Sequence, residues 1–200
     1  GVSQRLPDIA MELVLSNAER RALLHNEQLV VPRVGDIYAA LPGITGKIEL
    51  EYEGEMRGAD TVIREIIRAS VATIFDQYFA DTNTQQIEQW FNLGGTVQLN
   101  DAQPAAGSLA ELQQIQGLIE KLSPLKINGK SKPEVAVSAA EFLLEGMVAH
   151  KRISRSEERS FTAAEKKQRN NDAANYAEKM REREIERDDY AKNRTRRGFN

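Results

Sequence analysis

The sequence contains no cysteine. A chain without cysteine has no disulfide framework, no thiolate nucleophile and no metal site built on sulfur ligands. We therefore do not expect redox chemistry. This composition is consistent with a reducing compartment, and we predict a cytoplasmic protein.

Long apolar runs are also missing. No stretch approaches the roughly 18 consecutive apolar residues that a membrane-spanning helix needs. The first residues lack the basic-then-apolar pattern of a secretion signal. We therefore expect a soluble chain without a membrane partner.

Motifs that carry chemistry are scarce. Gly43-Ile44-Thr45-Gly46-Lys47-Ile48 superficially resembles a phosphate-binding loop, but Leu41 stands where that loop needs its first glycine and Ile48 where it needs serine or threonine. The carboxylates of Glu49, Glu51, Glu53 and Glu55 lack a calcium-loop pattern and are best interpreted as a solvated face. His25 and His150 have no histidine or cysteine partner at ligand spacing, so no metal site is predicted.

The composition of the chain is otherwise that of a folded protein. Of its 200 residues, 40% are hydrophobic and 28% are charged. Residues 151–200 hold 15 basic and 10 acidic residues, whereas residues 1–150 hold 12 basic and 20 acidic ones. The chain thus combines an acidic body with a basic tail, which could lie on the body or reach an acidic partner.

Apolar periodicity predicts several helices, supported by start and stop residues such as Pro7, Pro133 and Gly94-Gly95. Asp36 is interpreted as the N-cap of a short helix ending at Leu41. The expected helices cover residues 7–26, 36–41, 59–80, 84–93, 108–122 and 133–150, and the one over residues 108–122 is interrupted near Gly117.

Two regions leave alternatives open. Residues 41–55 alternate apolar residues with glutamates as a strand would, but they also fit helical spacing, which we favour. Residues 96–99 are expected to form a short strand, followed by a loop over residues 100–107. Beyond Arg152 the composition favours a charged, partly helical tail, and a helix that docks on a partner is the alternative. The basic cluster at residues 194–197 is too small to predict a nucleic-acid interface.

Arg5 is the residue with the most suggestive position. It lies at the start of the predicted helix over residues 7–26. A cation at the positive end of a helix gains nothing from the helix dipole, so a phosphate or carboxylate partner would explain it better than a plain surface role.

The segments around Arg5 resemble the lid subdomain of AAA+ ATPases of the MoxR and magnesium-chelatase group. In that group a Gly-x-Ser-x-Arg segment supplies the sensor-2 arginine, which Gly1, Ser3 and Arg5 match. Further likeness, with somewhat longer spacing, lies in Ala18-Glu19-Arg20-Arg21-Ala22-Leu23, Val31-Pro32 and Asp36-Ile37. Residues 36–50 and Gly94-Gly95-Thr96-Val97 are similar to members with a longer C-terminal extension.

The resemblance implies a mainly α-helical fold with one or two short strands. Residues 1–58 would form an AAA+ lid-like helical bundle, and residues 59–153 a helical extension. Residues 154–200 would form a charged tail that is helical or partly disordered. It implies that Arg5 and Ser3 contact the phosphate of ATP, with magnesium held in an upstream ATPase core. The implied partners are that core, neighbouring subunits of a ring, and proteins with a von Willebrand factor A domain. The sequence starts at Gly1, so we expect a fragment that does not hydrolyse ATP alone.

Three functions are compatible with these observations. The first is the lid and extension of a AAA+ ATPase that remodels, or inserts metal into, a partner protein. The second is a non-enzymatic helical interaction module in which Arg5 is incidental. The third, a regulator that binds nucleic acid through its basic tail, is the least supported, and we do not expect nucleic acid as a partner.

The ATPase interpretation predicts the sequence upstream of Gly1 in the parent gene. A Gly-x-x-x-x-Gly-Lys-Ser/Thr motif should lie within a couple of hundred residues before Gly1, because the phosphate loop must precede the lid. Reading that gene checks the prediction, and the lack of such a motif would contradict it.

Overall fold

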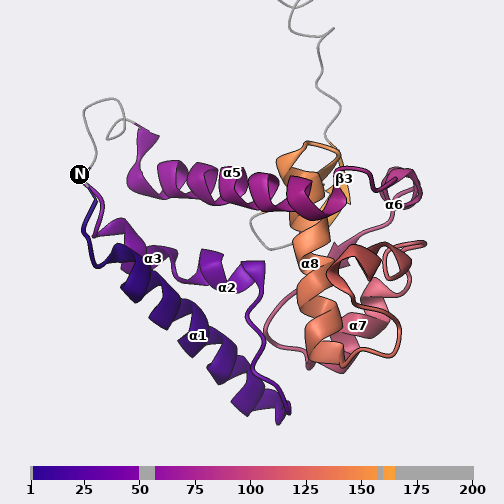
Figure 1. Cartoon of the computed structure of the whole chain (residues 1–200), viewed down its shortest axis with the longest axis horizontal. Helices are drawn as coiled ribbons and strands as arrows, with labels where there is room; N and C mark the ends of the chain where they lie inside the picture. The colour runs from indigo at the N-terminus through magenta and orange to yellow at the C-terminus, as the bar shows by residue number, and fades with distance from the viewer. Residues whose placement is uncertain (1, 50–56, 157–159, 165–200) are drawn as a thin grey trace, which may run out of the picture. The chain divides into compact units, whose positions relative to one another are not determined.

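The computed structural model describes residues 2–49, 57–156 and 160–164 of the chain (Figure 1). Within these residues the protein is mainly helical and carries a small antiparallel sheet. The α-helices are α1 (Leu6–His25), α2 (Val34–Ala39), α3 (Leu41–Thr45), α5 (Ala59–Phe79), α6 (Gln85–Asn92), α7 (Ala105–Leu112) and α8 (Pro133–Ala149). A 3-10 helix, η1 (Glu120–Leu125), and the strands β1 (Val97–Gln98), β2 (Ile153–Arg155) and β3 (Ser160–Ala163) complete the set.

A first apolar cluster joins α1, α2 and α3 to the first half of α5. Tyr38, Leu41 and Ile44 are buried in it, and Leu13 and Val14 of α1 pack against it. Burial of this apolar surface, at about 25 cal/mol per Å², is what holds these short helices together.

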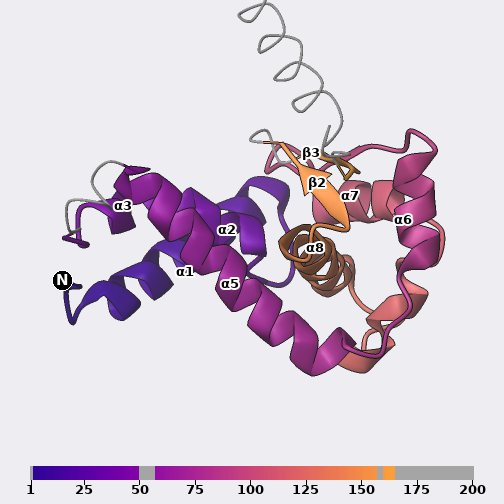
Figure 2. The ribbon, with the colours of Figure 1, turned by 90° about the horizontal axis from the view of Figure 1, so that it is seen from above.

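Helix α5 takes part in two clusters at once. Its buried residues follow each other at intervals of four, so they form one row along the helix. Ile63, Ile67 and Val71 belong to the first cluster, whereas Phe75 and Phe79 belong to a second. The helix therefore links the two clusters, and Figures 1 and 2 show its long course.

The second cluster surrounds α8. Val137, Ala140, Leu143, Leu144 and Met147 of this helix are fully buried against residues of α6, α7, η1 and the sheet. Phe142 packs against both clusters, so α8 is a second connection between them.

The sheet closes one side of this second cluster. Strand β3 lies between β1 and β2, and both pairings are antiparallel. Phe161 is the central residue of the sheet, because it pairs with Val97 on one side and with Arg155 on the other, and its side chain is buried.

Several sequence predictions are confirmed. The helices predicted over residues 7–26, 59–80, 84–93 and 133–150 correspond to α1, α5, α6 and α8 within two residues at each end, and residues 97–98 form the expected strand. The mainly helical fold class is therefore correct at this level. Whether it is an AAA+ lid-like bundle stays a proposal.

Other predictions need correction. Asp36 is not the N-cap of α2; it is the third residue of that helix, and its carboxylate accepts a hydrogen bond from the Arg33 N–H at 2.7 Å. Helix α7 begins at Ala105, inside the predicted loop, because Pro104 fixes the extended backbone before it.

The two regions that allowed alternatives are resolved in part. Residues 41–45 are helical as favoured, but Ile48 forms an antiparallel bridge with Val2, so the helix does not continue there. The rest of that region, residues 50–55, lies outside the described residues. Strands β2 and β3 occupy residues assigned to a helical or disordered tail, because their buried Ile153 and Phe161 add to the second cluster.

The described residues all fall within one compact unit. Domain boundaries at residues 58 and 153 stay a prediction, and residues 165–200 of the proposed tail lie outside the described part. None of the helices formed by the described residues has the length and apolar character needed to cross a membrane.

Gly146 is expected to be essential for the crossing of α5 and α8. A Cβ atom at this position would overlap the ring of Phe75. We predict that Gly146→Ala lowers the free energy of unfolding by about 1–3 kcal/mol, as overpacking of a core does. Urea unfolding followed by circular dichroism measures this change.

The matched control is Gly107→Ala in α7, where a Cβ meets only ordinary contacts at 3.6 Å or more. That variant should gain up to about 1 kcal/mol, because alanine favours a helix over glycine. Equal effects of the two substitutions would contradict the assigned role of Gly146.

Candidate functional site

The start of α1 carries the residues singled out from the sequence. Arg5 immediately precedes the helix, and its side chain is exposed. Its backbone N–H donates to the Ser3 hydroxyl at 3.4 Å, and its carbonyl accepts from the Ile9 N–H at 3.1 Å. Neither a hydrogen bond nor an ion pair joins the Arg5 side chain to another described residue.

The segment before α1 is held by main-chain contacts with residues 47 and 48. Val2 and Ile48 form an antiparallel bridge, and the Ser3 N–H donates to the Lys47 carbonyl at 3.1 Å. The Leu6 N–H then donates to the Ser3 carbonyl at 3.0 Å. This fixes the direction in which the chain enters α1, and with it the place from which Arg5 extends.

An open hollow of about 300 Å³ lies beside this bridge, lined by Val2, Ser3, Gly46, Lys47 and Glu49. The structure thus brings Ser3 next to Lys47. In the sequence, Lys47 belongs to a segment that lacks two of the residues that a phosphate-binding loop needs. The hollow has room for a phosphate group. It carries one cationic and one anionic side chain, so it has no strong net charge of its own.

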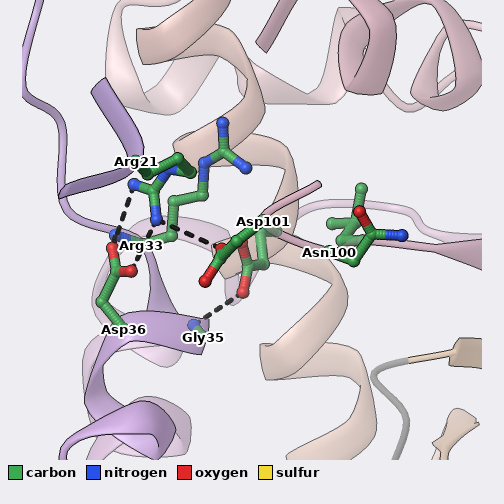
Figure 3. Close-up of a pocket in the computed structure, with 8 residues that line it drawn as sticks. Arg21, Arg33, Gly35, Asp36, Asn100 and Asp101 are labelled. Atoms are coloured by element: carbon green, nitrogen blue, oxygen red, sulfur yellow. Dashed lines mark hydrogen bonds and ion pairs between the residues drawn. The ribbon is translucent and has the colours of Figure 1, made fainter. Parts of the chain in front are cut away.

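A second polar group, which we name the Arg21–Asp36 cluster, is buried between α1, α2, α8 and the segment after β1 (Figure 3). It consists of Arg21, Arg33, Asp36, Asp101 and Glu141. Arg21, Arg33, Asp36 and Glu141 are at most 5% exposed. Charges at this depth are normally found only where they are paired and hydrogen-bonded.

Asp36 is the centre of this cluster. Its carboxylate accepts hydrogen bonds from both terminal nitrogens of Arg21 at 2.5 and 3.1 Å, from Asn17 Nδ2 at 2.5 Å and from the Arg33 N–H at 2.7 Å. The bidentate geometry is the strongest that arginine and carboxylate can form. Arg21 also donates to the Val31 carbonyl at 2.9 Å and lies 3.6 Å from Asp101 Oδ1.

The pKa directions of the two arginines differ for physical reasons. Burial alone would lower the pKa of Arg21, but the hydrogen bonds and charge of Asp36 outweigh it and raise that pKa. Burial lowers the pKa of Arg33, and the positive charge of Arg21 adds to the effect. Arg33 Nε and Nη2 are buried without a hydrogen-bond partner, and the Arg33 guanidinium carries no dashed line in Figure 3.

Polar side chains of α8 bind the backbone of the α1–α2 connection. The carboxylate of Glu134 accepts from the Gln28 N–H at 3.3 Å, the Ser138 hydroxyl donates to the Pro32 carbonyl at 2.7 Å, and Glu141 accepts from the Gly35 N–H at 2.7 Å. Glu134, Ser138 and Glu141 are four and three residues apart, so they share one face of α8. These contacts explain why Glu134 and Glu141 are buried.

Tyr38 of α2 is held between α8 and β2. The Arg155 guanidinium stacks 4.3 Å from the centre of the Tyr38 ring, and its Nε lies 2.8 Å from the carboxylate of Glu145. Burial, followed by the charge of Glu145, raises the pKa of Tyr38. These contacts join α2 to α8 and β2.

Both histidines have local partners. His25 Nε2 lies 2.8 Å from the Asp101 carbonyl, and His150 Nε2 lies 2.8 Å from Asp76 Oδ1. The described residues contain no group of three or more histidine, aspartate and glutamate side chains that could hold a metal ion. Glu51, Glu53 and Glu55 lie outside these residues.

Comparison with known proteins leaves the family open. No protein-family model matches the chain, and no match was found among curated proteins or solved structures. The interpretation of the site therefore depends on the geometry above.

Sequence reasoning missed the Arg21–Asp36 cluster. Arg20 and Arg21 are neighbours in sequence, yet Arg20 is exposed and Arg21 is buried. The available signal was the spacing of Asn17, Ala18 and Arg21, which places Arg21 on the inward face of α1.

Removing one partner of the buried pair should destabilise the fold strongly. We predict that Asp36→Asn lowers the free energy of unfolding by about 3–5 kcal/mol, because the buried charge of Arg21 loses its bidentate carboxylate and keeps only the longer contact with Asp101. Denaturant unfolding monitored by circular dichroism measures the loss.

Asp60→Asn is the control, since Asp60 pairs with Arg64 at 2.6 Å on the surface of α5. An exposed pair of this kind contributes about 0.3–0.5 kcal/mol. A loss for Asp36→Asn no larger than that of the control would show that the buried pair is not a major constraint.

Proposed function

We propose that this chain is the lid and C-terminal region of a AAA+ ATPase, in which Arg5 contacts the terminal phosphate of ATP bound to an upstream core. The resemblance of residues 1–41 to the MoxR and magnesium-chelatase group supports this proposal. The Arg5 side chain, exposed and without a partner among the described residues, is the observation that carries it.

The electrostatics at the start of α1 favour an external anion. Arg5 lies at the N-terminal end of a 20-residue helix, where the helix dipole is positive. Two sources of positive potential in one place are unfavourable for the free protein and attractive to a phosphate. Arginine suits that partner because its planar guanidinium binds phosphate oxygens in a bidentate manner.

The segment before α1 is anchored, and this fixes the position from which Arg5 would reach a phosphate. The bridge between Val2 and Ile48 and the hydrogen bond from Ser3 to Lys47 fix the backbone on which Arg5 is carried. A cation positioned in advance stabilises charge on a transferring phosphoryl group without reorganisation during the reaction. In this proposal Ser3 orients the Arg5 backbone and lies at the edge of the nucleotide site, and the core holds magnesium.

In this proposal, movement of the lid is transmitted from α1 through α2 to α8. Helix α1 is bound to α2 through Asp36, and α2 is bound to α8 through Glu141, so displacement of α1 shifts α8 as well. The proposed recipients are neighbouring subunits of a ring and a partner protein, such as one with a von Willebrand factor A domain. That partner would be remodelled, or loaded with metal, in the cytoplasm.

A non-enzymatic helical interaction module is the second candidate. It is favoured by apolar side chains on the solvent side of α1, where Met11, Leu23 and Leu24 are at least 60% exposed. In that case Arg5 is an ordinary surface residue.

The two candidates differ in what Arg5 does in the intact protein that includes the ATPase core. We predict that Arg5→Ala lowers ATP turnover by about 10²-fold, the loss typical of one oriented donor at a developing charge. Arg5→Lys should recover only part of the activity, because an ammonium group cannot bind in a bidentate manner. Phosphate release by the purified assembly measures both.

Arg64→Ala is the matched control, an arginine on α5 whose partner is the surface carboxylate of Asp60. It should leave turnover unchanged. Unchanged turnover in Arg5→Ala as well would refute the phosphate contact and favour the interaction module.

A further inference from the structure

Helix α1 has apolar residues on both of its faces. Ala10, Leu13 and Val14 pack against the first cluster, and Ala18 and Ala22 are buried. On the opposite side Met11, Leu15, Leu23 and Leu24 are 42–79% exposed. In Figure 1 the helix lies at the edge of the described fold, with α2 and α3 along one side of it. A helix that needed only its inward face would not carry this second set.

The exposed residues form two parallel rows with a spacing of four. One row consists of Met11, Leu15, Glu19 and Leu23, and the other of Asp8, Glu12, Ser16, Arg20 and Leu24. Rows of this spacing are the ridges by which helices pack into one another. We name the surface formed by these two rows the outer α1 face.

Two hollows border Leu23, the most exposed of these apolar side chains. One of about 400 Å³ is lined by Ser16, Glu19, Arg20, Leu23 and Leu24, so it lies between the two rows. The other, of about 470 Å³, is lined by Glu19, Ala22, Leu23, Asn26, Glu27 and Val30. Glu19 and Leu23 line both hollows. The outer α1 face is therefore uneven, and its hollows can receive side chains of a partner.

The charge of the outer α1 face is negative. Asp8, Glu12 and Glu19 are exposed, and none of them has an ion pair or hydrogen bond through its side chain within the described part of the chain. The single basic residue of the two rows, Arg20, is paired with Asp101 at 3.2 Å. The available charges are therefore carboxylates placed beside apolar side chains.

We infer that the outer α1 face docks an amphipathic helix of a partner protein, whose apolar stripe is flanked by lysine and arginine. From Met11 to Leu24 the face extends about 20 Å, at 1.5 Å per residue, which suits a partner helix of about four turns. The apolar stripe would pack on Met11, Leu15 and Leu23, and the flanking cations would face Asp8, Glu12 and Glu19.

A second copy of the same face is a poor occupant. Two outer α1 faces packed on one another would bring their carboxylates together, and like charges across an interface are costly. The basic flanks of the inferred helix remove this repulsion. The inference is independent of the proposed nucleotide contact, since it uses no property of Arg5.

The test uses a synthetic helical peptide of about 18 residues, with leucines at a spacing of three and four and lysines on both flanks. Fluorescence anisotropy measures its binding to the 200-residue chain. We expect saturable binding that weakens as salt is added, since exposed charges are screened. A twin peptide with glutamate in place of each lysine should not bind.

Two double variants locate the contact. Leu15→Ser with Leu23→Ser should weaken binding by about tenfold or more, as loss of central apolar anchors does. Glu12→Gln with Glu19→Gln should weaken it less and reduce its salt dependence. The control is Ile66→Ser with Ile74→Ser on α5, where both residues are similarly exposed, at 54% and 46%.

Three results would overturn the inference. The first is absence of binding by the lysine peptide, or equal binding by its glutamate twin. The second is equal loss in the α1 and α5 variants, which would indicate unspecific adsorption. The third is self-association in sedimentation that Leu15→Ser with Leu23→Ser abolishes, because the face would then be covered by a second copy. Arg5→Ala should not change peptide binding, so this test and that of the nucleotide contact fail separately.

Discussion

The buried pair of Arg21 and Asp36 is the constraint on which the arrangement of the other helices depends. A carboxylate without solvent access needs all of its acceptor capacity satisfied, and Asp36 receives four hydrogen bonds from α1 and from the residue before α2. Such a pair adds little net stability over an apolar contact, because removing two charges from water is costly. The pair does destabilise other arrangements of α1 and α2, because in them Arg21 or Asp36 would be buried without its partner.

Around this pair, the fold has two apolar clusters that share α5 and α8. The row from Ile63 to Phe79 belongs to both, and Phe142 touches both. Between the clusters, α8 binds the α1–α2 connection through polar side chains. Apolar contacts thus supply cohesion within each cluster, and directional hydrogen bonds hold the connection between α1 and α2 on α8. This division of roles suits a body that moves as a unit.

Much of the helical framework could be predicted, because long helices reveal themselves by periodicity. The row of α5 and the proline at the start of α8 are local signals. The burial of Asp36 was not predictable, since the arginine that it binds lies on α1, 15 residues earlier. The contact of Asp36 with the Arg33 N–H is local, but the sequence did not show that the helix begins two residues before Asp36. Strands β2 and β3 escaped prediction because each is short and lies in a strongly charged region. For the candidate site, sequence located Arg5 at a helix start, but the neighbourhood of Ser3 and Lys47 required the structure.

The antiparallel bridge at residues 2 and 48 is made of main-chain atoms alone. Evolution can therefore replace the side chains on both sides of it without loosening the hold on the start of α1. Related proteins would keep the number of residues from this bridge to the arginine, while the residues in between drift.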